Sequence, residues 1–556
     1  MDYISNMKGK LRIGILIGDI EKLKNWEYRI LKGIIEHPNL ELCLFIRDGR
    51  KQIHSLKNRL KRNLLTTKIF ANVLYTLQMK IESFVFKSKQ TVDTKEIINK
   101  IKNTETVYLS PVRKGFLDIF SKEDSDKIKS YGLDIILRHE FNIIRGDILN
   151  SARYGIWSYH HADNAINRGG PAGFWEIVNN EPYCGVTLQQ LTPELDGGLV
   201  IDKAWFNWHW SFFKNNNDLL EKSVVLLFKN INKLLNYSKI DTKKSLTYYN
   251  RLYKKPTITY ILIYMFRFYF KVFTHIFNKI FPLRRLSCWT LIFGKGKFIE
   301  STLFRTNPVS MPRNVFWADP FIYEYDNQLY VFFENYSYKT KKGKISVGKV
   351  AECTRDRYSV VDVQDILDFD YHVSYPQIIE EDGELFLIPE TYQSKRLEVY
   401  RCVQFPCKWE LYSTAFDGEE VVDTTYFSDG NGDRWLLLNK GWTHEAELHI
   451  YKIDNLKLEK VIAHRSNPVL IDCRKARNGG MIFKYENEYY RPSQINTHGI
   501  YGKGLQISKI KKLTLDIFED EPVIAIEPHF TKGLMGIHHL HQLENNFVFD
   551  VCYNKL

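Results

Sequence analysis

Residues 158–170 read SYHHADNAINRGG and gather several acid–base side chains in one short stretch. His160 and His161 are adjacent, and Asp163 follows two positions later. An imidazole near a carboxylate can relay protons close to neutral pH. No thiolate or further carboxylate stands at a spacing suited to zinc, so we expect no metal here. Proton-transfer chemistry and a hydrogen-bonded structural turn are the two interpretations of the loop.

The elements that position this loop alternate between strand-like and helix-like patterns over about residues 1–240. The runs LRIGILIG, LELCLFIR, LDIILR and GIWSYH predict strands, whereas EKLKNWEYRILKGIIEH and TKEIINKIKN predict helices. Such alternation predicts a doubly wound α/β domain with a mainly parallel sheet. Ligand sites of these sheets lie beyond the carboxyl ends of the strands. SYHHADN lies at such an end, where chemistry is expected.

The motifs around the loop resemble those of the folate-dependent formyltransferases, over about residues 10–230. His160 falls on the family histidine and Gly169 on the loop glycine. GVT at 185–187 and LDGG at 195–198 match in order and spacing, with Asp196 on the family aspartate. The resemblance implies a Rossmann-like formyltransferase fold for this part of the chain.

The resemblance also implies an activity. A formyl group would pass from N10-formyltetrahydrofolate, as co-substrate, to the amine of an amino sugar linked to a nucleotide or lipid, in surface-glycan biosynthesis. His160 would polarise the formyl group and relay the proton, and Asp196 would orient His160. Ser158 stands where the family has an Asn that stabilises the developing oxyanion, a donor whose loss costs about a hundredfold in rate. Asn164 is the nearby replacement donor that we expect.

Further residues receive roles from the same resemblance. The expected folate-binding residues are Phe141, Ile143, Ile144, Thr192 and Leu195. The expected acceptor-binding residues are His161, Asp163 and Arg168. No metal is expected at either position.

The chain changes character after about residue 298, where a strand–turn–strand unit recurs. Units begin at Ala318, Ser374, Val422, Lys475 and Ile537, roughly fifty residues apart. Five such units predict an all-β, five-bladed β-propeller. We expect the preceding segment FIESTLF to be a strand that closes the ring against the last blade.

These units resemble the propeller domain of glycosyltransferases such as the glucosamine inositolphosphorylceramide transferases, and more distantly five-bladed glycosidases. Asp319, Glu334, Glu390 and Asp423 are the expected carboxylate cluster in the central channel. A sugar-binding or scaffolding role, a hydrolase with two catalytic carboxylates and a purely structural role all fit this cluster. The second unit lacks an acid at its start, which weakens the hydrolase interpretation. HHLH, at 538–541, is not expected to bind a metal, because His539 and His541 would share a strand face that His538 does not.

Residues 257–282 combine many aromatic side chains with Arg267, Lys271, His275 and Lys279 at intervals of four. Between Thr242 and Ile299 there are twelve Lys and Arg and no Asp or Glu, out of a net charge of +13. The pattern predicts a helix that lies on an anionic membrane surface. A linker helix packed between two domains is the alternative. Charge confined to one segment disfavours binding to nucleic acid.

The 556 residues thus divide into an α/β domain (1–240), a basic aromatic linker (241–297) and a propeller (298–556). Eight scattered cysteines and a start without a secretory pattern favour a cytoplasmic protein, with peripheral attachment at the inner membrane face as a further expectation. Besides sugar N-formylation, two alternatives stay open. One is a membrane-associated glycan-binding or scaffold protein with an inactive formyltransferase domain, and the other is a propeller glycosidase. The sequence does not indicate an oligomeric state.

Overall fold

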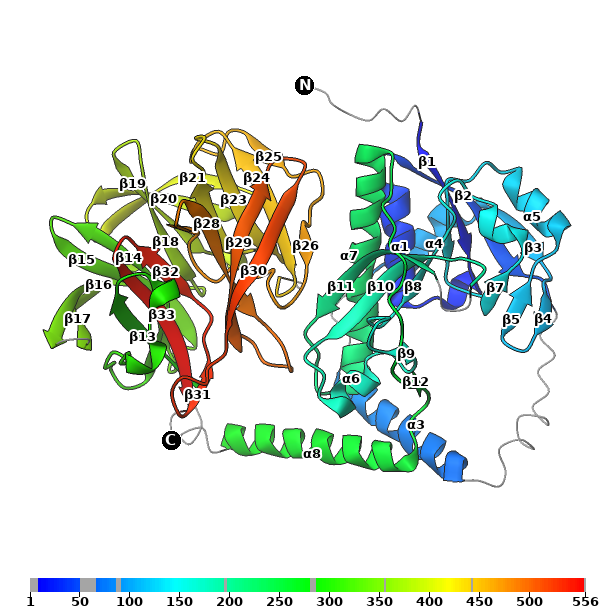
Figure 1. Cartoon of the computed structure of the whole chain (residues 1–556), viewed down its shortest axis with the longest axis horizontal. Coiled ribbons are helices and arrows are strands. Elements are labelled where there is room, and N and C mark those ends of the chain that lie inside the picture. The colour runs from blue at the N-terminus through cyan, green and yellow to red at the C-terminus, as the bar shows by residue number, and fades with distance from the viewer. Residues whose placement is uncertain are drawn as a thin grey trace. The chain divides into compact units, whose positions relative to one another are not determined.

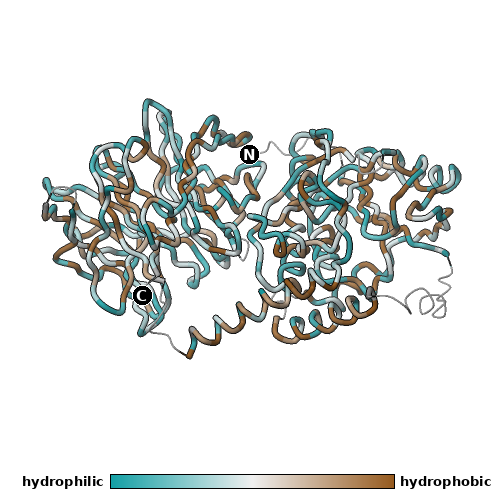
Figure 2. The backbone as a smooth tube through the Cα atoms, turned by 60° about the horizontal axis from the view of Figure 1, so that its bottom comes forward, coloured by the Kyte–Doolittle hydropathy of each residue, from teal (hydrophilic) through white to brown (hydrophobic). Residues whose placement is uncertain are grey.

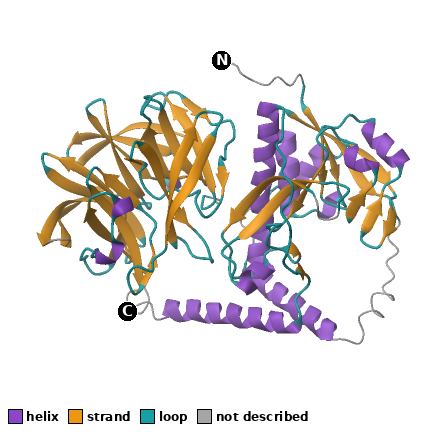
Figure 3. Ribbon diagram, in the orientation of Figure 1, coloured by secondary structure: helices purple, strands orange, loops and turns teal. Residues whose placement is uncertain are grey.

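The computed structural model describes residues 9–50, 67–86, 92–194, 198–280, 287–354, 357–441 and 444–554. The chain divides into two compact units, Met1–Val272 and Phe273–Leu556. Figure 3 shows strands with most of the helices in the first unit and strands almost throughout the second. An α/β N-terminal region and a sheet-rich C-terminal region are therefore as predicted. The boundary falls inside one helix, so the predicted domain limits at 240 and 297 stay predictions.

The N-terminal unit is organised around a seven-stranded sheet in the order β11-β10-β8-β6-β1-β2-β3. Its strands are β1 (Leu11–Leu16), β2 (Leu40–Asp48), β3 (Glu105–Leu109), β6 (Ile135–Arg138), β8 (Ile156–His160), β10 (Cys184–Gln190) and β11 (Leu199–Phe206). The five strands from β3 to β8 pair in parallel, and β10 and β11 join antiparallel at one edge. The sheet thus has the mainly parallel core that the alternating pattern predicts.

Helices α1 and α7 contact this sheet, and further helices and two small sheets complete the unit (Figure 1). The helices are α1 (Asn25–Glu36), α3 (Thr67–Val85), α4 (Thr94–Ile101), α5 (Lys122–Lys129), α6 (Phe174–Asn179), α7 (Phe212–Tyr237) and α8 (Ile258–Ile280). The small sheets join β4 (Val112–Lys114), β5 (Leu117–Ile119) and β7 (Ile143–Arg145), and β9 (Arg168–Gly169) with β12 (Leu252–Tyr253). A Cβ on Gly33 of α1 would lie 2.2 Å from Cζ of Phe228 in α7, so glycine permits the close approach of these helices.

The C-terminal unit consists of successive antiparallel sheets. One sheet joins β13 (Ser287–Lys295) with β31 (Leu534–Gly536), β32 (Leu540–Leu543) and β33 (Asn546–Asn554). Two further sheets consist of β14 (Val315–Tyr325), β15 (Gln328–Ser337), β16 (Lys342–Thr354) and β17 (Arg357–Leu367), and of β18 (Ser374–Glu381), β19 (Glu384–Glu390), β20 (Leu397–Gln404) and β21 (Lys408–Ala415). The last two consist of β22 (Val421–Ser428), β23 (Arg434–Lys440), β24 (Glu447–Ile453), β25 (Val461–Ala463) and β26 (Leu470–Ile471), and of β27 (Phe483–Tyr485), β28 (Glu488–Ile495), β29 (Gly504–Leu513) and β30 (Phe518–Ile526). Apolar side chains between neighbouring sheets form the core of the unit.

The strand that joins the two ends of this unit is not the predicted one. FIESTLF contains two 3-10 turns, Phe298–Glu300 and Leu303–Arg305, and no strand. Instead β13, which the sequence analysis placed in the linker, pairs antiparallel with β33 along its whole length. The apolar run of β13 buries Leu291, Ile292 and Phe293 in succession, so both faces of the strand are covered.

Candidate functional site

Three strands of the C-terminal unit hold a non-glycine residue in the left-handed backbone region at equivalent places. Asp319 (β14), Tyr375 (β18) and Asp423 (β22) have φ of 50°, 49° and 45°. Each lies where the register with the next strand shifts. Left-handed conformations are costly for buried side chains other than glycine and concentrate at functional sites. The bends therefore mark a site at this end of the sheets.

Asp550 of β33 forms the first half of this site. It is fully buried and accepts hydrogen bonds from the backbone N–H groups of Asp319, His538 and His539. Its Oδ1 also lies 2.9 Å from Nδ1 of His538. Nε2 of His538 in turn lies 3.9 Å from Oδ1 of Asp319. A histidine thus stands between two buried carboxylates.

Asp423 forms the second half with Arg477. Nε of Arg477 donates to Oδ2 of Asp423 at 2.6 Å, and the amide of Gln494 donates to the same oxygen at 3.2 Å. The backbone N–H of Asp423 donates to Glu390 at 3.2 Å. Both members of the ion pair are buried, so neither charge is solvated by water and each depends on the other.

The remaining predicted carboxylate, Glu334 of β15, is also buried. Its Oε1 accepts no hydrogen bond and lies 3.6 Å from Nε2 of His372. The structure therefore buries all four of Asp319, Glu334, Glu390 and Asp423, and their expected place in a central channel stays a prediction. We refer to these four with Asp550, His538 and Arg477 as the carboxylate cluster.

The members of the carboxylate cluster differ in how the surroundings shift their pKa values. Burial raises the pKa of Asp319 to about 7, the charges of Asp423 and Asp550 add to this, and His538 opposes it. Burial likewise raises the pKa of Glu334 and Glu390 well above the usual range. Burial alone would lower the pKa of His538, but Asp550 and Asp319 raise it. The site therefore combines carboxyl groups that stay protonated with groups that carry charge, the combination that acid–base catalysis uses.

Aromatic rings border the cluster. The indole of Trp289, half-buried in β13, stacks on His538 with ring centroids 3.9 Å apart and planes 12° apart. Tyr501 contacts His538 edge-on, and the guanidinium of Arg477 lies 4.8 Å from the centre of the Tyr501 ring. Flat apolar rings beside hydrogen-bonding carboxylates are suited to the faces and hydroxyl groups of a sugar.

Sequence reasoning missed Asp550, His538 as a cluster member, Arg477, Tyr501 and Trp289. His538 and His539 precede β32 and are not part of a strand, so the face argument for HHLH was wrong. Ligand atoms of Asp319, His538 and Asp550 lie within 4.8 Å of one another, a spacing that can hold a cation. The oxygens of Asp550 are, however, already engaged by three N–H groups and an imidazole.

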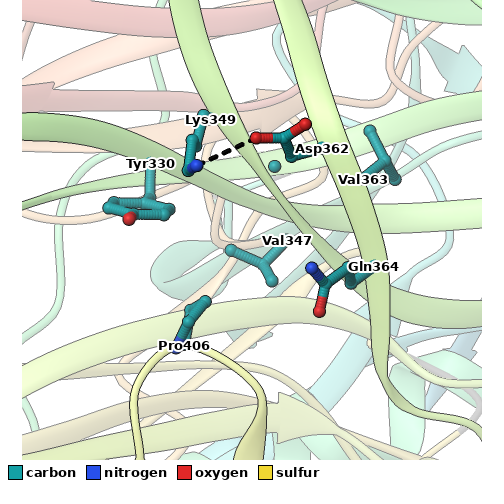
Figure 4. A pocket seen from close by; sticks show the side chains of 8 residues that line it. Tyr330, Val347, Lys349, Asp362, Val363, Gln364 and Pro406 are labelled. Atoms are coloured by element: carbon teal, nitrogen blue, oxygen red, sulfur yellow. Dashed lines mark hydrogen bonds and ion pairs between the residues drawn. The ribbon is translucent and has the colours of Figure 1, made fainter.

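A separate pocket of about 420 Å³ lies beside the outer strands β16 and β17 (Figure 4). Lys349 and Asp362 form an ion pair of 2.9 Å at its edge, and Pro406 faces Val347 and Gln364. None of the cluster carboxylates lines it. We therefore treat the carboxylate cluster, and not this pocket, as the candidate site.

Side chains of the loop at residues 158–170 form hydrogen bonds with other residues of the N-terminal unit. Nη1 of Arg138 donates to the hydroxyl of Ser158 at 2.9 Å, and Ser158 is only 2% exposed. Nε2 of His160 lies 2.8 Å from the carbonyl oxygen of Asn167. The amide of Asn164 donates to Ser245 at 3.1 Å. Ser158 and Asn164, the two expected oxyanion donors, are thus committed to internal partners.

The expected acceptor-binding residues are also used internally. Asp163 is buried and accepts from Nζ of Lys203 at 2.6 Å and from the indole of Trp205 at 3.0 Å. His161 packs against Trp26 and Tyr159, and burial lowers its pKa to about 3. Arg168 donates to the carbonyl of Asn164 and to Ser245, and it stacks on Tyr248. These contacts hold the loop together, and the expected role of the three residues in binding an acceptor stays a prediction.

Two of the residues expected to bind folate lie in the apolar core. Phe141 and Ile144 are buried in an apolar core cluster, and their expected role in binding folate stays a prediction. Ile143 and Thr192 are half-buried. Leu195 and Asp196 lie outside the described residues, and the predicted pairing of Asp196 with His160 stays a prediction.

Comparison with known proteins points to the C-terminal unit. Residues 302–543 match the family described as glucosamine inositolphosphorylceramide transferase 1, N-terminal. Glucosamine inositolphosphorylceramide transferase 1 of Oryza sativa subsp. indica is 32% identical over 216 residues, which are 37% of this chain and 28% of that protein. The chain thus spans under a third of the length of this curated relative. The resemblance inferred from the repeated units is confirmed for this region.

Solved structures are similar to parts of this chain only at low TM-scores. Glycinamide ribonucleotide transformylase 1 from Symbiobacterium toebii has 13% identity and a TM-score of 0.27, covering 40% of this chain and 85% of its own. An exo-β-1,3-galactanase from Phanerochaete chrysosporium with β-1,3-galactotriose has 14% identity and a TM-score of 0.32, covering 43% and 60%. Similarities of this extent support no functional argument.

The expectation of folate-dependent formyl transfer is therefore wrong. The curated relatives are named as transferases of a different kind, for glucosamine inositolphosphorylceramide. The commitment of Ser158 and Asn164 to Arg138 and Ser245 agrees with this correction. A scaffold with an inactive formyltransferase domain and a propeller glycosidase gain no support from the comparisons either.

Proposed function

We propose that the chain is a glycosyl-group transferase whose C-terminal unit handles the sugar at the carboxylate cluster. The five sheets from β13 to β33 would be the blades of a five-bladed propeller, and the bent strands would present Asp319, Tyr375 and Asp423 to its channel. The N-terminal unit would have a formyltransferase-like fold without that activity.

The observation that carries the proposal is the paired arrangement of two carboxylates in different environments. Asp319, with a pKa of about 7 beside His538, is suited to take a proton from an attacking hydroxyl group at neutral pH. Asp423, fixed by Arg477, is suited to stabilise positive charge that develops on a sugar ring as its bond to the leaving group breaks. Trp289 and Tyr501 would contact the ring faces.

The matched family supplies the substrate class for the proposal. Residues 302–543 include Asp319, Asp423, Arg477 and His538, so the matched region carries most of the cluster. By the names of the relatives, the acceptor would be an inositolphosphoryl lipid or a related phosphoglycan, and the transferred group would be a hexose or hexosamine. The cluster itself does not select among these sugars.

Sugar transfer by the full chain tests the proposal. The chain is incubated with labelled nucleotide-linked hexoses and hexosamines and with phosphoinositol-containing lipids, and labelled lipid is measured. Replacing Asp319 with Asn, or Asp423 with Asn, should lower the rate at least about a hundredfold, because each removes a group on which the reaction depends. Asp362→Asn is the control, since Asp362 belongs to the outer pocket. Transfer that survives both cluster substitutions would refute the site, and no transfer with any pair would refute the activity.

A further inference from the structure

Helices α3 and α8 of the chain both present large apolar side chains to solvent. On α3, Phe70, Val73, Leu77, Ile81 and Phe84 are 62%, 58%, 54%, 40% and 84% exposed, at helical spacing. On α8 the exposed apolar residues are Leu262, Ile263, Phe266, Tyr269, Phe270, Phe273, Ile276, Phe277 and Ile280. Figure 2 shows both helices largely in the brown of apolar residues. Contiguous apolar surface of this kind is unusual on a protein that has no partner for it.

Buried polar contacts fix α3 against the start of α8. The hydroxyl of Tyr264 donates to Oε1 of Glu82 at 2.6 Å, and the hydroxyl of Tyr269 donates to Oε1 of Gln78 at 3.0 Å. Glu82 is fully buried and Gln78 nearly so. The two helices therefore form one structural element, whose outer rows face away from these bonds.

The same glutamate ties this element to the rest of the N-terminal unit. The hydroxyl of Ser211 and the backbone N–H of Phe213, at the start of α7, both donate to Oε2 of Glu82. A carboxylate is favoured at a helix N-terminus, where N–H groups lack partners. The inner face of α8 is likewise satisfied, because Ile261, Tyr264 and Phe268 are buried. The exposed apolar side chains of α3 and α8 therefore lie outside these interior contacts.

Charge identifies the kind of surface that covers these rows. Glu82 is the only acid of α3 and is buried, and α8 contains no acid at all. Lys80, Lys254, Lys255 and Lys279 are exposed on or next to the two helices. Arg267 is also exposed, and its Nη1 donates to the carbonyls of Ile177 and Val178 at the end of α6. Apolar rows flanked by lysines complement anionic headgroups above acyl chains, whereas a second copy would bring equal charges together.

We propose that α3 and α8 together form a docking face for the surface of an anionic lipid bilayer, with α3 as an anchor equal to α8. The face is interfacial: no helix in the described part of the chain is long and apolar enough to cross a membrane. Phe70, Phe84, Phe266 and Phe270 would enter the boundary between headgroups and acyl chains. This inference does not depend on the proposed glycosyl transfer.

Vesicle flotation with the full chain tests the inference. Vesicles of phosphatidylcholine alone are compared with vesicles that contain phosphatidylglycerol, at low and high salt. We expect at least tenfold more bound protein on the anionic vesicles, and less at high salt as headgroup attraction is screened. Phe70→Glu/Phe84→Glu, which alters only α3, should lower this binding at least tenfold.

Phe116→Glu is the matched control, because Phe116 is 80% exposed between β4 and β5 and belongs to neither helix. Its binding should equal that of the unchanged chain. Circular dichroism shows whether each variant is folded. Vesicle binding unaltered by the α3 substitutions would overturn the role of α3, and equal binding to neutral and anionic vesicles would overturn the role of charge. A concentration-dependent dimer that the α3 substitutions dissociate, without vesicle binding, would show that a second copy is the occupant.

Discussion

Nδ1 of His538 lies 2.9 Å from Oδ1 of Asp550, and the two residues are buried together beneath the stacked ring of Trp289. Asp550 also accepts three backbone N–H groups, one of them from Asp319. A single carboxylate therefore sets both the orientation of the imidazole and the bend at Asp319.

Replacing Asp550 with Ala should destabilise the C-terminal unit by about 3–5 kcal/mol, because three N–H groups and an imidazole lose their buried acceptor. Urea unfolding followed by tryptophan fluorescence measures the change. Asp550→Asn keeps one acceptor oxygen and should lose less. An alanine variant as stable as the unchanged chain would contradict the network.

The stability of the C-terminal unit should fall as pH rises. The pKa of Asp319 is raised from 3.8 to about 7 in the folded chain, so its protonation stabilises the fold fully below pH 3.8, and this stabilisation is lost as pH rises through 7. The raised pKa of His538 acts in the same direction above pH 6.5. Asp319→Asn should therefore be more stable than the unchanged chain at pH 8, by about 2–4 kcal/mol, with little difference near pH 4. Urea unfolding across this range, with Asp362→Asn as control, checks the slope, and an unchanged slope in Asp319→Asn would refute it.

Arg477→Gln should cost about 3–5 kcal/mol of stability, since Asp423 would keep a buried charge without its partner. Arg477→Gln combined with Asp423→Asn should recover part of this loss, because neither charge remains. Thermal unfolding of the single and double variants gives the coupling energy. Additive losses would mean that the pair does not interact.

Glu82→Ala should release α3 from the N-terminal unit and cost about 2–3 kcal/mol, because two hydroxyl groups and an N–H lose their acceptor. Hydrogen exchange should accelerate over residues 67–86 and much less in the central sheet. Ser83→Ala is the control, as the hydroxyl of Ser83 donates to the carbonyl of Lys80 in its own helix. Slow exchange of α3 in the alanine variant would show that Glu82 is not its anchor.

Local patterns were sufficient for much of the fold. The ADPFIYEYDNQLYVFFE pattern becomes the β14–β15 hairpin, whose turn residues Asp326 and Asn327 adopt the left-handed conformation that these residue types tolerate. The alternation of apolar runs likewise predicted the parallel sheet. In the hairpin the deciding interactions are between residues close in sequence, whereas the parallel strands pair over longer separations, such as Ile13 with Ile135.

The features that sequence analysis did not predict depend mainly on contacts between residues far apart in sequence. VFDVCYN is an ordinary strand pattern. The pairing of β32 with β33 places Asp550 near His538, whereas the contact of Asp550 with Asp319 joins residues 231 positions apart. Helix α3 obtains its inner partners, Ser211 and Tyr264, well over a hundred residues later. Ser158 appeared available in the sequence because the approach of Arg138 from the neighbouring strand leaves no local signal.

The pairing of β13 with β33 also bears on how the chain matures during synthesis. All strands of the seven-stranded sheet are complete by Phe206, so the N-terminal unit has its sheet while the ribosome is still translating the remainder. Strand β13 emerges soon afterwards but must wait for residues 546–554 to leave the exit tunnel. Until then the edge of β13 that pairs with β33 is open. The carboxylate cluster is therefore complete only after Asp550 has been synthesised.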